Sequence, residues 1–287
     1  MKGILSIAKT THILKTDLVP KTKIWTLVGT GKAYDDCGEF GFKGCLNVEK
    51  HSQRINNLSV EGQAFVKGFK RSCDRSECPI CFEKWAGKQA KRSKLRIKSY
   101  KSGYRKTIHL TCSLPKTDYD IFDDEEGYKK VRSKAYKLIK KSGFVGGNLV
   151  PHPFRKDASG WYYSPHFHAV GYGWIENSKA IYDKTGYVIK NLRVRKSTVG
   201  TLYYQLNHAG VSLLKDKVTG KYGYNTITWF GQLSYNKLKF TPEKEEPEKC
   251  PLCDEKLVRI VFVGLDRPPP EEEKEFYDSV SNWTPKA

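Results

Sequence analysis

Hydrophobic and polar positions change their period along the chain, which predicts alternating helices and strands. Residues 82–99 repeat apolar positions at helical spacing, with lysine and arginine over the remaining surface, so a helix is expected there. A second helix is expected over 120–141, because acidic residues occupy its first turns and lysines its last, which suits the helix dipole. A third begins with Ser197 as its N-cap, runs to about Ala209 and is followed by Gly210.

Alternating segments rich in β-branched and aromatic residues predict strands between these helices. The expected strands cover residues 106–113, 144–151, 161–172, 187–195 and 225–235. Turn-forming residues 157–160 join the second and third strands into a hairpin. Helices and strands are mixed and the sheet is expected to be mainly antiparallel, so the predicted fold class is α+β.

The C-terminal segment differs in composition from the body of the chain. Charge density and proline content rise at residues 240–249, which marks a boundary. Cys250 to Leu265 are expected to form a small knuckle with a strand, and residues 266–287 an extended or partly disordered tail. The predicted domains are a cysteine-rich region with the basic helix, a central domain, and a C-terminal knuckle with an acidic tail, over residues 1–99, 100–240 and 241–287.

The overall composition is that of a folded protein. Of 287 residues, 38% are hydrophobic and 13% aromatic, which supports a packed core and excludes wholesale disorder. No apolar segment reaches the roughly 18 residues that span a bilayer. The apolar stretch at the N-terminus is too short for a signal peptide. We therefore expect a soluble, intracellular protein.

Basic residues are concentrated in one part of the chain. The net charge is +20 overall, +23 over residues 1–236 and −3 from Lys237 to the end. Lys67 to Lys106 alone carry +11, which is typical of proteins that bind a polyanion. Nucleic acid is favoured as the partner over an anionic membrane or a merely solvated surface. The candidate phosphate contacts on the first predicted helix are Lys88, Lys91, Arg92, Lys94 and Arg96.

Seven of the eight cysteines stand in clusters with metal-ligand spacing. In an intracellular chain such clusters indicate metal rather than disulfides. Cys78-Pro-Ile-Cys81 and Cys250-Pro-Leu-Cys253 each present two thiolates suited to tetrahedral zinc. The other candidate ligands, enough for one or two structural zinc ions in all, are Cys37, Cys45, His51 and Cys73. Cys112 stands alone in an apolar strand and is expected in the core.

The sharing of these ligands has two alternatives. One puts Cys73, Cys78 and Cys81 with one upstream ligand and joins Cys250 and Cys253 to the remainder. The other pairs the two C-P-x-C segments directly, as in a zinc ribbon split by a long insertion. A redox dithiol or a set of buried free thiols is the competing interpretation.

Two histidines and a tyrosine form the candidate catalytic group. His166 and His168 alternate on a predicted strand and share one face, about 7 Å apart, where they can hold one divalent metal. Phe167 faces the core. On the third predicted helix, Tyr204 and His208 are four residues apart and share a face. A phenol, with a pKa of about 10, is a weak nucleophile, so attack on a phosphodiester requires a metal that polarises the phosphate. His208 either completes the metal site or accepts the phenol proton.

Three segments in this order carry a family resemblance: TIHLTCS (107–113), PHFHAVGYG (165–173) and LYYQLNH (202–208). They resemble the three motifs of the HUH endonucleases, which are named for two histidines flanking a hydrophobic residue. Among these, the chain looks most like the rolling-circle replication initiators (Rep proteins) of archaeal plasmids and viruses. In those proteins a cysteine-rich segment precedes the first motif, as Cys73 to Cys81 does here.

The resemblance implies an HUH fold over residues 100–240, a central antiparallel sheet with flanking helices related to the RNA-recognition topology, beside the zinc-binding elements. It implies that Tyr204 attacks one DNA strand at an origin and leaves a 5′-phosphotyrosine link and a free 3′-OH that primes synthesis. His166 and His168 would hold Mg²⁺ or Mn²⁺, with His208 as the third ligand by analogy with related transposases. His152 is the other candidate. The resemblance also implies action in the host cytoplasm, and because no P-loop is present we expect a host helicase and polymerase as partners.

Departures from the family pattern leave alternatives open. Asn207 and His208 stand where many members have lysine, so the pattern does not identify the proton acceptor. Because position 208 is not a second tyrosine, a single-tyrosine enzyme is expected. Two alternatives stay open. One is a transposase or relaxase with the same chemistry, and the other is a zinc-dependent nucleic-acid-binding regulator without catalysis. Single-stranded DNA is the expected substrate, with bases stacked on Tyr162, Tyr163 or Trp174.

Overall fold

The computed structural model describes residues 19–51, 54–55, 58–100, 103, 106–193, 197–214, 224–242, 246–265 and 274–286. The chain forms two compact units, each built from two segments. The first unit consists of Met1–Ala33 and Asp74–Pro242, and the second of Tyr34–Cys73 and Glu243–Ala287. These units differ from the predicted domains, because the region predicted as 1–99 is divided between them. Strands from the two segments of the second unit pair with one another, so those segments fold together despite their separation in sequence.

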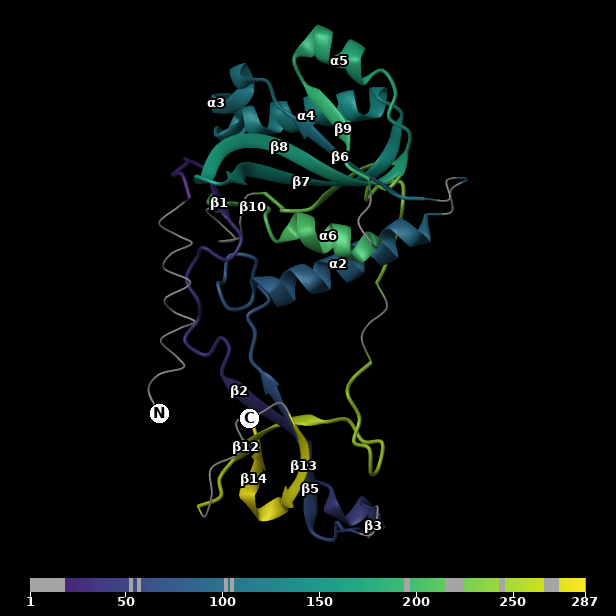
Figure 1. The fold of residues 1–287 in the computed structure, drawn as a ribbon. Coiled ribbons are helices and arrows are strands. Elements are labelled where there is room, and N and C mark those ends of the chain that lie inside the picture. Colours follow the sequence, from purple (N-terminus) through teal and green to yellow (C-terminus); the bar gives the residue numbers. More distant parts are fainter. Residues whose placement is uncertain are drawn as a thin grey trace. The chain divides into compact units, whose positions relative to one another are not determined.

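The first unit is organised around a five-stranded antiparallel sheet (Figure 1). The strand order is β11-β7-β8-β6-β9. The bounds are β6 (Ile108–Ser113), β7 (Phe144–Asp157), β8 (Gly160–Gly173), β9 (Val188–Asn191) and β11 (Thr228–Gly231). A separate pair is formed by β1 (Trp25–Leu27) and β10 (Gly210–Ser212). Antiparallel pairing throughout, with helices beside the sheet, confirms the predicted α+β class.

Helices cover both faces of this sheet. Their bounds are α2 (Phe82–Ser99), α3 (Tyr119–Phe122), α4 (Glu125–Lys141), α5 (Ser178–Thr185) and α6 (Thr198–Leu206), with a 3₁₀ turn η2 (Lys116–Asp118) before α3. Figure 1 shows α3 and α4 on one side of β7 and β8, and α2 and α6 on the other. Neighbouring residues of β7 follow this division: Leu149 packs in the cluster that contains α4 side chains, and Val150 in the cluster that contains α2 and α6 side chains.

The helix predictions are right in place, with two corrections at the ends. The helix over 82–99 is confirmed as α2. The helix predicted over 120–141 is interrupted at Asp123, whose carboxylate accepts hydrogen bonds from the backbone N–H groups of Lys23 (2.8 Å) and Ile24 (3.0 Å). Asp124 then caps α4 by accepting from the N–H of Gly127 at 2.7 Å. Tertiary hydrogen bonds from the two residues that precede β1 thus accompany the end of the first helical segment.

The third helix begins as predicted and ends earlier. Ser197 is its N-cap, because the Ser197 hydroxyl accepts from the N–H of Gly200 at 2.9 Å. The helix ends at Leu206 instead of continuing to Ala209, since the chain must turn before Gly210 begins β10 and pairs with β1.

The strand predictions are right in position and less accurate in length. The hairpin around 157–160 is confirmed, and its strands β7 and β8 have 14 residues each. The strands predicted over 187–195 and 225–235 correspond to the shorter β9 and β11. Residues 194 and 195 of the former lie outside the described part of the chain.

The second unit is also a five-stranded antiparallel sheet. Its order is β13-β5-β2-β12-β14, with a short separate pair β3-β4. The bounds are β2 (Phe40–Cys45), β3 (Arg54–Ile55), β4 (Leu58–Ser59), β5 (Gln63–Lys70), β12 (Val258–Phe262), β13 (Glu275–Ser279) and β14 (Trp283–Pro285), with 3₁₀ turns η1 (Val48–Lys50) and η3 (Val280–Asn282).

The predicted C-terminal tail is wrong where the structure describes it. Residues 274–286 contain β13 and β14, which pair with β5 and β12. Trp283 is buried against Ala64, Val66 and Ile260, and its indole N–H donates to the Asp278 carboxylate at 3.1 Å. The acidic composition predicted a tail, because composition does not show that one buried side chain, Trp283, is enough to hold a short strand against the sheet. Residues 266–273 of the predicted tail lie outside the described residues.

The structure was also searched for membrane spans. Among the described residues, no helix combines the length and the apolar character that crossing a membrane requires.

The capping bond of Asp124 gives a direct test of the interrupted helix. Asp124→Ala removes the acceptor for the N–H of Gly127, so we expect the free energy of unfolding to fall by about 1 kcal/mol. Asp124→Ser keeps a capping oxygen and should stay within about 0.5 kcal/mol of the unmodified protein. Urea unfolding followed by far-UV circular dichroism measures both variants. Equal stability of the alanine variant would contradict the assigned cap.

Candidate functional site

Strand alternation places His166 and His168 together on β8. His166 and His168 point to the face covered by α2 and α6, and both are buried, with 3% and 6% of their surface exposed. Phe167 between them is fully buried in the cluster on the other face. The sequence pattern therefore predicted correctly which face of the strand carries the two imidazoles.

A third histidine comes from the neighbouring strand. His152 on β7 lies directly opposite His166 in the hairpin register. Ligand nitrogens of His152, His166 and His168 all lie within 4.8 Å of one another, and Nε2 of His166 is 3.1 Å from Nε2 of His168. Two nitrogens that bind one cation at about 2.1 Å lie about 3.0–3.4 Å apart at octahedral or tetrahedral angles. The pair thus has the spacing of two ligands to one ion.

The other ring nitrogens of these histidines are held by the protein. Nδ1 of His166 donates to the carbonyl of Ser164 at 2.8 Å. Nδ1 of His168 lies 2.8 Å from Nε2 of His109, and His152 has a backbone hydrogen bond with Gln205. Such contacts fix ring orientation and leave the opposite nitrogen for a metal.

An unsatisfied nitrogen supports the same interpretation. Nε2 of His152 is buried and has no hydrogen-bond partner among the described residues. A buried polar atom without a partner costs free energy, unless a ligand satisfies it. Burial also lowers the pKa of His152 and of His168 well below the ordinary value, and burial with the nearby charge of Arg155 lowers the pKa of His166 to about 3. All three rings are therefore neutral at physiological pH, as metal ligands must be.

The donor set discriminates between the expected cations. The group contains three imidazoles and no carboxylate. Mg²⁺ prefers oxygen ligands, whereas imidazole suits transition metals. Of the predicted Mg²⁺ or Mn²⁺, the residues fit Mn²⁺ better, and a first-row transition metal such as zinc would also suit them.

The tyrosine helix ends beside this cluster. Leu202 and Leu206 are fully buried and fix the inner face of α6, as predicted. The Tyr204 and His208 rings share another face, with centroids 4.9 Å apart. His208 lies close enough to His152 to lower the pKa of that imidazole. The predicted nucleophile and the three-histidine cluster thus belong to one region of the first unit.

His208 itself stands outside the group of ligand nitrogens. Its Nδ1 donates to the carbonyl of Tyr204 at 3.1 Å, and its ring lies 5.9 Å from the Trp161 ring. The structure therefore places His152, and not His208, with His166 and His168.

Buried amides couple α6 to the sheet. Asn148 on β7 donates to the side-chain oxygen of Gln205 at 3.1 Å and accepts from the N–H of Val170 at 2.6 Å. Asn148 and Gln205 are both fully buried. This bridge holds the tyrosine helix over the strands that carry the histidines. Sequence analysis missed it, because nothing in one strand or one helix shows that two distant amides meet.

His109 was also missed as a functional residue. It lies in the TIHLTCS strand and is buried, with its ring stacked 5.0 Å from the ring of His168. Because Nε2 of His168 faces His166, Nδ1 of His168 is the atom that donates to His109 when a metal is bound. His109 and Thr111 lie on the same face of β6, and Thr111 pairs with His168. This alternation was the sequence signal that could have placed His109 beside the histidine pair.

A cavity of about 450 Å³ lies beside His168. Arg155, Lys190, Ser113 and Thr111 line it. The Arg155 guanidinium donates to the hydroxyls of Ser113 (2.8 Å) and Ser164 (3.2 Å), which fixes its position. Two cations and hydroxyl groups beside the histidines suit a phosphate group.

The second unit carries a four-ligand cluster. Ligand atoms of Cys45, His51, Cys250 and Cys253 lie within 4.8 Å of one another. Sγ of Cys45 is 3.6 Å from Sγ of Cys253, and Nε2 of His51 is 3.4 Å from Cys45 Sγ and 3.6 Å from Cys250 Sγ. Around tetrahedral zinc, two sulfurs lie about 3.8 Å apart, and sulfur and nitrogen about 3.6 Å. These distances match, so the four residues can hold one zinc ion.

Local contacts prepare this cluster for a cation. Nδ1 of His51 donates to the carbonyl of Gln63 at 2.9 Å, which directs Nε2 toward the sulfurs. The N–H of Leu252 donates to Sγ of Cys250 at 3.4 Å. Burial raises the pKa of the Cys45 thiol to about 12, so a thiolate there requires a cation. This grouping favours the predicted arrangement in which Cys250 and Cys253 join upstream ligands.

The remaining predicted zinc ligands are divided between the units. In the first unit, ligand atoms of Cys78 and Cys81 lie within 4.8 Å of each other at the start of α2. In the second unit, Cys37 and Cys73 lie equally close. Each pair supplies half of a tetrahedral set, and a site of Cys73, Cys78 and Cys81 with one upstream ligand stays a prediction from sequence spacing. The eight cysteines are all described and none forms a disulfide; Cys112 is fully buried in the core, as predicted.

The predicted DNA contacts on α2 need one correction. Lys91 and Arg92 are exposed and Lys94 is half-buried, which suits contact with phosphates. Lys88 forms an ion pair with Asp74 at 2.6 Å. Arg96 is buried and donates to the carbonyls of Leu233 and Leu238, so it is not a surface phosphate contact.

The predicted stacking residues differ in exposure. Trp174 and Tyr162 are exposed, at 67% and 42%. Tyr163 is packed against the core and donates its hydroxyl proton to the carbonyl of Tyr119 at 2.8 Å. The prediction for Tyr163 as a stacking platform is therefore wrong.

Comparisons with known proteins add no family to this picture. No family model matches the chain, and comparison with curated proteins and with solved structures found no match.

The three-histidine cluster predicts one transition-metal site in the first unit. With zinc already bound at the cysteines, the protein should bind one Mn²⁺, measured by calorimetry and electron paramagnetic resonance. His152→Ala should abolish this binding, because it removes a ligand. His109→Phe should weaken it about 10–100-fold, because His168 loses its orienting partner. His208→Ala should leave the affinity for Mn²⁺ unchanged. If His208→Ala loses Mn²⁺ and His152→Ala keeps it, His208 and not His152 is the third ligand.

The cluster in the second unit predicts a structural zinc. Cys253→Ser should lower the zinc content by one ion per chain, measured by mass spectrometry of the purified protein. It should also destabilise the second unit, because its small core depends on the metal. Cys112→Ala removes a cysteine that lies outside the four-ligand cluster and outside the two cysteine pairs, and should keep the full zinc content. Unchanged zinc in Cys253→Ser would contradict the assignment.

Proposed function

We propose that the protein cuts and rejoins a DNA strand with Tyr204 as nucleophile, and thereby initiates rolling-circle replication of a plasmid or virus. The observation that carries the proposal is the buried group of His152, His166 and His168 at the end of the tyrosine helix. The order of the three HUH-like segments and the basic charge of the first 236 residues support it.

His152, His166 and His168 would hold a divalent cation, which would supply positive charge to polarise the scissile phosphate. The chain's own residues orient the other participants. Arg155 and Lys190 line the cavity beside His168 and bind the phosphate oxygens. Asn148 and Gln205 hold α6 against the sheet, so Tyr204 is presented from a rigid element.

The chemical step is an exchange of one ester for another. The phenol oxygen of Tyr204 forms a bond to phosphorus, and the bond from phosphorus to the 3′-oxygen breaks. The phenol proton passes to His208, whose Nδ1 donates to a backbone carbonyl and whose Nε2 carries the lone pair. The 3′-oxygen takes up a proton from water. Reversal of these events rejoins the strand without an external energy source.

This function predicts a covalent adduct with single-stranded DNA. An oligonucleotide from the replication origin, incubated with the protein and Mn²⁺, should give a protein–DNA adduct on a denaturing gel. Tyr204→Phe should abolish the adduct, because it removes the nucleophilic oxygen. Tyr203→Phe is the matched control and should react normally, since Tyr203 packs against the core cluster beside α2.

The outcomes separate the competing functions. An adduct in Tyr204→Phe that is lost in Tyr203→Phe would assign the other tyrosine. Binding without any adduct, abolished by zinc removal, would indicate the non-catalytic regulator. Transfer of a cut end to a second DNA molecule, without priming, would favour a transposase or relaxase.

A further inference from the structure

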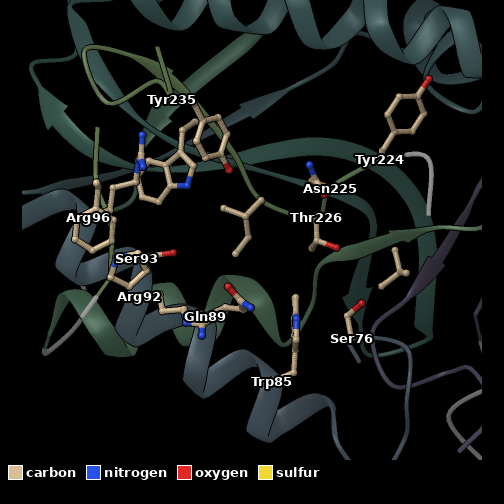
Figure 2. A pocket seen from close by; sticks show the side chains of 15 residues that line it. Ser76, Trp85, Gln89, Arg92, Ser93, Arg96, Tyr224, Asn225, Thr226 and Tyr235 are labelled. Atoms are coloured by element: carbon tan, nitrogen blue, oxygen red, sulfur yellow. The ribbon is translucent and has the colours of Figure 1, made fainter. Parts of the chain in front are cut away.

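A second cavity, of about 600 Å³, opens in the first unit beside α2. Figure 2 shows Trp85, Gln89, Arg92 and Arg96 projecting into it from one helix, with Tyr235 on the opposite wall. Trp229 of β11 completes the aromatic lining. This cavity is separate from the one beside His168, since the two share no residue.

A stacked arginine forms one wall. The Arg96 guanidinium lies 5.1 Å from the Trp229 ring and 4.8 Å from the Tyr235 ring. Its hydrogen bonds to the carbonyls of Leu233 and Leu238 use Nε and Nη2. Arg96 is therefore fixed as a flat cationic surface, and its Nη1 edge remains for a ligand. This accounts for a buried arginine in the segment that sequence analysis assigned to DNA.

The rest of the lining mixes apolar and hydrogen-bonding side chains; the apolar ones include Val211, Ile227 and Phe240. Hydrogen-bonding side chains come from both walls of the cavity: Ser76, Gln89, Ser93, Asn225 and Thr226. None of the described residues that line it is acidic. Arg92 is exposed at the edge, where a phosphate can reach it. Flat aromatic walls, amide groups and cations together fit a nucleobase with its phosphate.

The cavity and the histidines lie on the same face of the sheet. Trp229 pairs with Asn148 of β7, and His152 lies four residues further along that strand. At about 3.4 Å per residue this is roughly 14 Å. Asn148, Val150 and His152 alternate onto the face covered by α2 and α6. One DNA strand can therefore reach both places.

We propose that this cavity holds one unstacked nucleobase of the DNA strand that Tyr204 cuts. The inference rests on the proposed function and adds a recognition site to it. The base stacks in the aromatic lining, its edge bonds to the amides, and Arg92 binds the adjoining phosphate. A base held about 14 Å along the sheet from the metal group fixes which phosphate lies beside Tyr204.

Photo-cross-linking tests the proposal without any cleavage. The zinc-loaded protein, without Mn²⁺, is irradiated with an oligothymidylate of about 12 nucleotides that carries 5-iodouracil at varied positions. Peptide mapping should place cross-links at Trp85, Trp229 or Tyr235. Cross-links confined to exposed aromatics such as Trp174, or none at all, would overturn the proposal.

Matched variants show whether the cross-links and the binding of oligothymidylate depend on the cavity itself. Thr226→Trp fills the cavity without changing charge, and should remove these cross-links while circular dichroism stays unchanged. It should also weaken oligothymidylate binding about 10-fold, and leave binding of an abasic oligomer of equal length unchanged. Arg92→Ala should weaken binding more than Lys91→Ala, because only Arg92 lines the cavity. Equal effects of the two, or persistent cross-links in Thr226→Trp, would contradict the site.

Failure of this site and failure of the proposed function are distinguishable. Cross-links in the cavity without any Tyr204 adduct would keep the nucleobase site and reject strand cutting. An adduct without cavity cross-links would keep the enzyme and reject the nucleobase site.

Discussion

The register of the β7–β8 hairpin is the constraint on which the candidate site depends. It sets Val150 opposite His168 and His152 opposite His166, and it shifts between His152 and Phe154, directly after the last ligand. A slip of one residue would send every side chain of a strand to the other face. A slip of β8 would turn His166 and His168 into the apolar cluster around Phe167, and the group would lose two of its three ligands. Burial of Leu149 on one face and Val150 on the other enforces this register.

Burial keeps these imidazoles neutral, which is the form that binds a metal. Each one has lost its contact with water, which keeps it neutral, and each has one nitrogen held by the protein. The second nitrogens converge, and that of His152 has no partner among the described residues. Such a group is costly in a core unless a cation completes it. The bridge from Asn148 to Gln205 then ties the tyrosine helix to the same strands, so the proposed nucleophile and the candidate ligands share one scaffold.

The second unit has a small apolar core and a cluster of candidate metal ligands. Its sheet has two small apolar clusters, one around Trp283 and one around Phe65 beside the cysteines and His51. Four ligands drawn from residues 45–51 and 250–253 close a loop of about two hundred residues, and a metal there offsets a large loss of chain entropy. The division of charge between the body and the C-terminal segment matches this division of tasks. The basic residues accompany the proposed DNA sites, and the acidic segment belongs to the second unit, which carries the candidate zinc ligands.

The sequence by itself determined the local elements and the pair on one strand. Periodicity located α2, the hairpin and the capped tyrosine helix, and alternation put His166 and His168 on one face, because these features depend on neighbours in the chain. Only the tertiary structure decided the rest. It placed His152 and His109 beside the histidine pair, and it grouped Cys45 and His51 with Cys250 and Cys253. It also buried Arg96 against the Trp229 and Tyr235 rings, and it paired residues 275–279 and 283–285 as strands of the second sheet. Each of these depends on which distant segments lie side by side, and packing of the whole chain fixes that choice, which no local pattern records.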